Sequence, residues 1–301
     1  MTLPDTFVVG AGRCGTTALY RFLGRHPQIE VGRQKSPNHF ATGIPQPSWE
    51  TPEAVAMARH WVSDRKEYES LFRPDEATRA VVDVSPVYLQ AIAVPERIHT
   101  ARPDARIIAV LRDPARRAVS HFLGRRRDGI EPPTASLRDT LAAQAAGPLP
   151  TDVAFGHYVG VGQYHHFLAP YLELFGRDRV LVLFHDDLVT DPHATVERVF
   201  RFLDVDTDVD VRTDDTDRPN RTGEIRSPAR RWLWTRSNRL RTTLRPLLPE
   251  RVRRGVGRGF LGDLRRDEIP PDLLSLVSDA LAEDTALLAA MLDHDLSAWR
   301  H

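Results

Sequence analysis

The most constraining stretch of this chain is residues 7–19, where an apolar run leads into a glycine-rich loop and a helix-like segment. From Gly10 to Thr17 the loop reads Gly-Ala-Gly-Arg-Cys-Gly-Thr-Thr. A loop of this kind ahead of a helix points backbone N–H groups at one place, and the helix dipole favours an anion there. Glycines let the backbone approach a ligand closely, and Arg13 adds a full positive charge. The stretch therefore predicts a cradle for a phosphate-like group, with a tight turn ahead of a packed helix as the alternative.

The spacing of this loop is similar to the nucleotide-triphosphate motif G-x-x-x-x-G-K-[ST] but differs at the lysine. Gly10 and Gly15 fit the two glycine positions, and Thr17 falls at the Ser/Thr position. Thr16 stands where the motif has its lysine. An ATPase or kinase with this loop would lack the charge that reaches the terminal phosphates, so the loop argues against a triphosphate ligand.

Composition limits what the rest of the chain can be. The 301 residues include 41% hydrophobic side chains, enough for a sizeable core in one large α/β domain or two small ones. Lys plus Arg and Asp plus Glu both number 41, so net charge does not indicate a nucleic-acid partner. Cys14 is the single cysteine, which excludes an internal disulfide and permits a reducing compartment. Without a signal-like start or a run of about 20 apolar residues, we expect a soluble, cytoplasmic protein.

Strand-like and helix-like segments alternate along the chain. Short apolar runs predict strands at residues 28–31, 80–86, 106–111 and 179–184. Helical spacing of apolar residues, together with proline starts, predicts helices at residues 16–25, 53–72, 95–102, 114–124, 137–146, 160–175, 192–203, 230–244 and 271–292. This alternation predicts an α/β, P-loop-like three-layer fold, in which helices flank a mainly parallel central sheet.

Several polar residues fall where parallel strands are expected to end. Asp83 lies near the end of one apolar run, and Arg112 directly follows another. Open α/β sheets place ligand groups at the carboxyl ends of their strands. The cluster Lys-Ser-Pro-Asn-His-Phe at residues 35–40 fits neither a helix nor a strand. The alternatives are a surface ion pair between Arg112 and Asp113, and a purely structural role for Asp83.

These features occur in the order found in one enzyme family. The glycine loop, the cluster at residues 35–40, Asp-Val-Ser-Pro from Asp83, Arg-Asp-Pro from Arg112 and the later Ser120 follow one another. Together they resemble the sulfotransferases that use 3′-phosphoadenosine 5′-phosphosulfate (PAPS), closest to the heparan-sulfate-type branch and its bacterial relatives. The resemblance covers about residues 7–227 and implies that 3′-phosphoadenosine 5′-phosphate (PAP) is released, with no metal required.

The resemblance assigns most of the donor site. It implies that the 5′-phosphosulfate is held by the loop residues Arg13, Cys14, Gly15, Thr16, Thr17 and Ala18. It implies that Arg112 and Ser120 grip the 3′-phosphate, and the fork of an arginine suits a phosphate because it donates two parallel hydrogen bonds. A late basic loop closes over the same phosphate in the family. Residues 220–227 resemble that loop, with Arg226 as the first choice and Arg221 as the second.

The catalytic base is where the chain departs from the family. Arg13 is expected to stabilise the charge that develops on the leaving oxygen, with Lys35 assisting. Many relatives read Lys-Glu-Pro where this chain has Lys35-Ser36-Pro37, and the glutamate is their usual base. Asp83 and His39 are the two substitutes, and the sequence does not choose between them. A structural histidine remains the alternative for His39.

We therefore expect one sulfotransferase domain over residues 1–301, with a core at about 5–227 and a helical part at about 228–301 that would serve as an acceptor lid. The expected acceptor is a hydroxyl of a carbohydrate, a glycolipid or a specialised metabolite. A peripheral membrane contact is left open, and no nucleic-acid partner is expected. Two other functions remain: a P-loop phosphotransferase, against which Thr16 argues, and a non-catalytic nucleotide-binding protein, for which Ser36 argues.

Overall fold

A five-stranded parallel sheet forms the centre of the protein, in the order β2-β3-β1-β4-β5. The computed structural model describes residues 2–43, 60–132, 134–150, 157–209 and 269–301, and the backbone of 224–225 and 264–265. The strands are β1 (Thr6–Gly10), β2 (Ile29–Val31), β3 (Ala80–Val84), β4 (Arg106–Leu111) and β5 (Val180–Phe184), with a separate antiparallel pair of β6 (Glu224–Ile225) and β7 (Leu264–Arg265).

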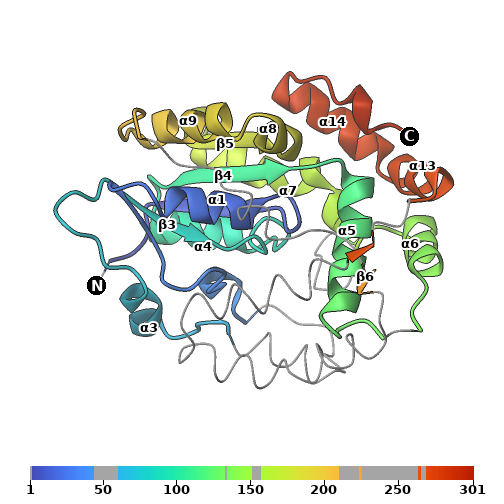
Figure 1. Ribbon diagram of the computed structural model, residues 1–301. Helices are drawn as coiled ribbons and strands as arrows, with labels where there is room; N and C mark the ends of the chain where they lie inside the picture. Colours follow the sequence, from blue (N-terminus) through green and yellow to red (C-terminus); the bar gives the residue numbers. More distant parts are fainter. Residues whose placement is uncertain are drawn as a thin grey trace.

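The strands are apolar because helices flank the sheet (Figure 1). Every residue of β1 and β3 is buried, and β4 is buried at all positions after Arg106. This confirms the predicted α/β fold with a parallel central sheet. The α-helices are α1 (Thr16–Leu23), α3 (Arg65–Ser70), α4 (Val94–Ala101), α5 (Pro114–Arg127), α6 (Leu137–Ala146), α7 (Tyr164–Phe175), α8 (His185–Thr190), α9 (Pro192–Leu203), α13 (Pro271–Ala280) and α14 (Ala282–Leu292).

A second, smaller core lies beside the sheet, where α5, α6 and α13 come together (Figure 1, right). Its buried residues include Phe122 of α5, Leu141 of α6 and Val277 of α13. This packing fixes α5, which directly follows β4 and therefore stands at the edge of the sheet where the strands end. None of the helices in the described ranges is long and apolar enough to cross a membrane.

Two of the predicted helices have the predicted bounds, and a side chain caps the start of each. Ser136 accepts a hydrogen bond from the N–H of Asp139 at 3.2 Å and begins α6. Asp191 accepts one from the N–H of Ala194 at 3.0 Å and begins α9. Both are N-cap contacts of the usual kind, so each helix start depends on residues that are adjacent in the sequence.

Three predicted helices are broken or much shortened in the structure, while the others in the described ranges differ by at most a few residues at their ends. The helix expected at 160–175 is a 3₁₀ turn, Gly160–Gly162, followed by α7, because Gln163 has non-helical angles. The helix expected at 271–292 breaks at Leu281 into α13 and α14. Of the helix expected at 53–72, the described residues 60–72 are helical only at Arg65–Ser70, where the Asp64 side chain caps the first turn. The helix expected at 230–244 lies outside the described residues.

Candidate functional site

The glycine loop turns from β1 into α1 as expected, and two glycines are required by their surroundings. A Cβ on Gly10 would lie 2.5 Å from Leu89 Cβ, and a Cβ on Gly15 would lie 2.9 Å from Leu188 Cδ2. Gly15 also has φ of 95°, in the left-handed region that favours glycine. It begins α1, for which the described residues supply no side-chain cap. No described side chain therefore takes the N–H groups of Thr16 and Thr17, whereas the N–H of Ala18 donates to the carbonyl oxygen of Gly15 at 2.9 Å.

Arg13 reaches α5 and contacts Ser120, a residue that the resemblance assigns to the other end of the donor. Its Nε donates a hydrogen bond to Ser120 Oγ at 3.2 Å. A Cβ on Gly124, one turn further along α5, would lie 3.1 Å from Arg13 Cζ, so glycine makes room for the guanidinium. Burial, and then the charge of Arg127, lower the pKa of Arg13 to about 10, which leaves it charged at neutral pH. The fold thus brings together two predicted site residues from distant parts of the chain.

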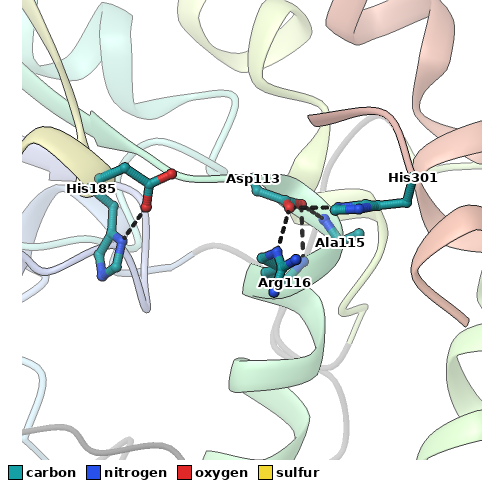
Figure 2. A network of polar contacts seen from close by, with 6 residues as sticks. Asp113, Ala115, Arg116, His185 and His301 are labelled. Carbon is teal, nitrogen blue, oxygen red and sulfur yellow. Dashed lines mark hydrogen bonds and ion pairs between the residues drawn. The ribbon is translucent and has the colours of Figure 1, made fainter. Parts of the chain in front are cut away.

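Arg112 and Asp113 follow β4, and Asp113 organises the start of α5. Asp113 Oδ1 accepts hydrogen bonds from the N–H groups of Ala115, at 2.9 Å, and Arg116, at 3.0 Å. Its Oδ2 lies 3.2 Å from Arg116 Nε and 2.7 Å from His301 Nε2 (Figure 2). Arg116 and His301 therefore engage this carboxylate. The positive charge of Arg112 is felt in the glycine loop, where it contributes to lowering the pKa of Arg13.

His185 is a site residue that the sequence reasoning missed. It begins α8 directly after β5, and its Cδ2 lies 3.6 Å from where a Cβ on Gly15 would be. Burial, and then the charge of Arg112, lower its pKa, while Asp186 Oδ1, 3.0 Å from Nδ1, opposes the shift (Figure 2). The available signal was its position after the apolar run 179–184, where another strand was predicted to end.

A buried layer supports the loop from behind. The Sγ of Cys14 lies 3.8 Å from the hydroxyl oxygen of Tyr164, and both side chains are buried. Burial raises the pKa of the thiol, and the charge of Arg117 opposes this. Cys14 is thus a neutral spacer that contributes its backbone to the loop, and Tyr164 is a core residue. Thr16 is buried on the same turn, with Thr17 and Ala18 partly exposed beside it.

The second cluster crosses the carboxyl end of β3, next to β1 in the sheet. The N–H of Ser36 donates to the carbonyl oxygen of Val84 at 2.9 Å, which ties the cluster to the strand. Lys35 Nζ lies 3.4 Å from Ser36 Oγ. Burial lowers the pKa of Lys35 to about 8, and the negative charge of Asp83 opposes the shift.

The two candidate bases have different surroundings. Asp83 is buried and accepts three hydroxyl hydrogen bonds, from Tyr68 at 2.7 Å, Tyr88 at 2.9 Å and Ser85 at 2.7 Å. Burial raises its pKa, and these bonds oppose the shift. This is the environment of a structural carboxylate, because three of its roughly four acceptor sites are already used.

His39 has one ring nitrogen, Nε2, that can act as a hydrogen-bond acceptor. Its Nδ1 lies 2.9 Å from the carbonyl oxygen of Val62, so this nitrogen donates. In the neutral ring, Nε2 is then the acceptor. The ring stacks on Tyr68, with centroids 4.2 Å apart, which fixes its plane.

Two predicted site residues, Arg221 and Arg226, lie outside the described residues. Within the part of the chain that the structure describes, no three His, Cys, Asp or Glu side chains gather into a metal-binding cluster. The described groups that could hold an anion are the loop N–H groups, Arg13 and Arg112.

Fold and site together define an α/β protein with a glycine-rich loop between β1 and α1 at the carboxyl edge of its sheet. The profile of the sulfotransferase family matches residues 4–209, and the chain belongs to this family, as the sequence predicted. Human heparan sulfate glucosamine 3-O-sulfotransferase 6 is 28% identical over 200 residues, which cover 66% of this chain and 52% of that protein. The Drosophila melanogaster bifunctional heparan sulfate N-deacetylase/N-sulfotransferase is 26% identical over 220 residues, covering 68% and 20%.

Among solved structures, a sulfotransferase from Alicyclobacillus acidocaldarius is similar over all of both chains, with a TM-score of 0.71 and 28% identity. The chain spans about half the length, 52%, of the human relative and less of the fly protein. The similarity therefore establishes family and fold.

Proposed function

We propose that this protein transfers a sulfuryl group from PAPS to a hydroxyl of a carbohydrate, a glycolipid or a specialised metabolite, and releases PAP. The observation that carries the proposal is the contact between Arg13 of the loop and Ser120 of α5. It joins the residues assigned to the two ends of the donor, and Arg112 lies two residues before the same helix. The heparan sulfate sulfotransferases among the relatives support a glycan as the first acceptor to test.

The residues fit a phosphosulfate with a second phosphate. The uncapped N-terminus of α1 and the glycine loop offer N–H donors, and Arg13 supplies a charge that persists at neutral pH. Arg112 and Ser120 would hold the 3′-phosphate. In the reaction, the acceptor oxygen forms a bond to sulfur, the bond from sulfur to the 5′-phosphate oxygen breaks, and the acceptor proton passes to a base. Arg13 would stabilise the negative charge that remains on PAP.

We assign the base to His39 and a positioning role to Asp83. His39 has an acceptor nitrogen left after its Nδ1 contact with Val62, whereas Asp83 already accepts three hydroxyl groups. Asp83 also anchors Ser85, whose hydroxyl accepts from the N–H of Asn38 beside the histidine at 3.2 Å. Lys35 would add positive charge near the sulfate.

Transfer of labelled sulfate from PAPS to a panel of acceptors tests the proposal, beginning with glucosamine-containing polysaccharides. Transfer that requires PAPS and no added metal is the expected result. Turnover of ATP with magnesium would favour the phosphotransferase. Tight PAP binding without transfer to any acceptor would favour the non-catalytic nucleotide-binding protein.

A further inference from the structure

Residues 293–301, which we call the brace segment, fold into a defined turn after α14. Asp293 has φ of 49° and ends the helix, and the N–H of His294 donates to the carbonyl oxygen of Ala289 at 3.1 Å. The side chain of Asp295 accepts from the N–H of Ser297 at 2.9 Å, just ahead of the 3₁₀ turn Ser297–Trp299. The segment is therefore held by its own backbone contacts.

Aromatic contacts join the brace segment to elements next to the site. Trp299 is 8% exposed and meets Phe184 and Tyr164 edge-on, with centroids 6.0 Å away in each pair. His294 stacks on Phe184 at 4.3 Å. Phe184 immediately precedes His185, and Tyr164 is the residue behind Cys14 in the glycine loop. The segment thus packs behind both the loop and the end of β5.

The third contact is polar and reaches the end of β4. His301 Nε2 donates to Asp113 Oδ2 at 2.7 Å, and both side chains are largely buried, with 15% and 5% exposed (Figure 2). Arg116 Nε shares the same oxygen at 3.2 Å. The other oxygen of Asp113 caps α5, so His301 holds the carboxylate that fixes the first turn of this helix.

We propose that the brace segment positions the donor site, and that His301 is its positioning residue for the 3′-phosphate. The proposal rests on the proposed function. Asp113 lies between Arg112 and α5, which carries Ser120, and those two residues are the assigned 3′-phosphate ligands. Loss of the His301 hydrogen bond leaves the buried oxygen of Asp113 with Arg116 alone, so the carboxylate and the backbone beside it gain freedom. The 5′ end of the donor, held by the loop after β1, is not fixed by this contact.

The test compares two ligands by calorimetry, PAP and adenosine 5′-phosphate, which lacks the 3′-phosphate. Their affinity ratio reports the 3′-phosphate contacts alone. The wild type is expected to prefer PAP. His301→Ala should lower that preference about three- to tenfold, because the lost hydrogen bond to the charged Asp113 affects the 3′-phosphate ligands only in part. His301→Gln should restore the preference, since its amide N–H can donate to Asp113. His193→Ala, at an exposed histidine of α9, is the control.

Each outcome has a separate meaning. A wild type without a preference for PAP refutes the proposed donor site, and the positioning role with it. A normal preference in the wild type that changes by less than about twofold in His301→Ala refutes the positioning role alone. Equal weakening of both ligands, or failure of His301→Gln to restore the preference, also refutes it. His301→Phe keeps an aromatic ring without the N–H donor. If His301→Ala does not fold, the affinity ratio of the two ligands is measured in His301→Phe in its place.

Discussion

At the scale of single residues, the site depends on charges that the fold has placed in unusual surroundings. Arg13 keeps its charge while it lies against Ser120, and Lys35 is held where burial favours its neutral form. Asp83 is occupied by three hydroxyl groups. The residue types were visible in the sequence, but not every partner was, because Tyr68 reaches Asp83 from a separate helix, α3. Each role can be separated by substitution.

Arg112→Ala is expected to weaken PAP binding by about 1.5–3 kcal/mol, the usual loss for a hydrogen bond to a charged group. Calorimetry at fixed salt measures this directly. Arg198→Ala, at an exposed arginine whose ion pair with Asp187 is 3.8 Å long, is the matched control and should leave PAP affinity unchanged. Equal affinity of Arg112→Ala and wild type would remove Arg112 from the donor site.

His39→Ala should lower turnover at saturating PAPS by about 10²–10⁴-fold, because it removes the general base. Asp83→Asn should instead lower the free energy of unfolding by about 1–3 kcal/mol, since the amide group cannot accept all three hydroxyl hydrogen bonds as the carboxylate does. Steady-state kinetics and urea unfolding of both variants separate the two effects. A folded Asp83→Asn without turnover, beside an active His39→Ala, would reverse the assignment.

Lys35 makes the stability of the protein depend on pH. Burial lowers its pKa from 10.5 to about 8, so between these values the unfolded chain keeps a proton that the folded chain has lost. Stability from this residue therefore rises with pH across that window. Lys35→Met lacks the cost of the buried charge, and its advantage over wild type in urea unfolding should shrink from about pH 7 to about pH 9.5. An advantage that stays constant with pH would show that Lys35 is not desolvated.

At the scale of elements, helix starts that depend on neighbouring residues could be predicted from the sequence, whereas contacts between distant segments could not. The bounds of α6 and α9 follow from Ser136 and Asp191, which cap their own helices. The unexpected breaks at Gln163 and Leu281 meet at one contact, because a Cβ on Gly162 would lie only 2.6 Å from Leu281 Cδ1. Both breaks therefore lie where two segments more than a hundred residues apart pack together, and no local pattern can indicate such a contact.

The same principle gives a prediction for α5, whose Gly124 accommodates Arg13. Alanine at this helical position should raise the free energy of unfolding by up to about 1 kcal/mol, because glycine is a poor helix former. Its Cβ, however, would press on the Arg13 guanidinium at 3.1–3.3 Å and displace it from Ser120. Gly124→Ala should thus be more stable in urea and slower in sulfuryl transfer.

A double-mutant cycle decides whether the cost in activity passes through Arg13. In an Arg13→Ala background, Gly124→Ala should cause no further loss of turnover. An equal loss in both backgrounds would mean that glycine matters to α5 for a reason other than the arginine.

At the scale of the whole molecule, the order β2-β3-β1-β4-β5 gathers the site at one edge of the sheet. Asp83 is the second-last residue of β3, the glycine loop follows β1, Arg112 follows β4 and His185 follows β5. The sequence predicted the parallel sheet, and hence that strand ends would share an edge. It did not predict the strand order, which places β1 between β3 and β4. The predicted cytoplasmic location and the acceptor lid stay predictions.

Because four neighbouring strands end at the site, a ligand bound there should stabilise the whole fold. PAP at about 100 times its Kd should add about 2.7 kcal/mol to the free energy of unfolding. For a chain of this size that corresponds to a rise in Tm of roughly 5 °C, which differential scanning fluorimetry resolves. Adenosine 5′-phosphate at the same concentration should give a smaller rise, since it lacks the group assigned to Arg112 and Ser120. Magnesium should leave the rise with PAP unchanged, whereas a larger rise with ATP and magnesium would favour a phosphotransferase over sulfuryl transfer.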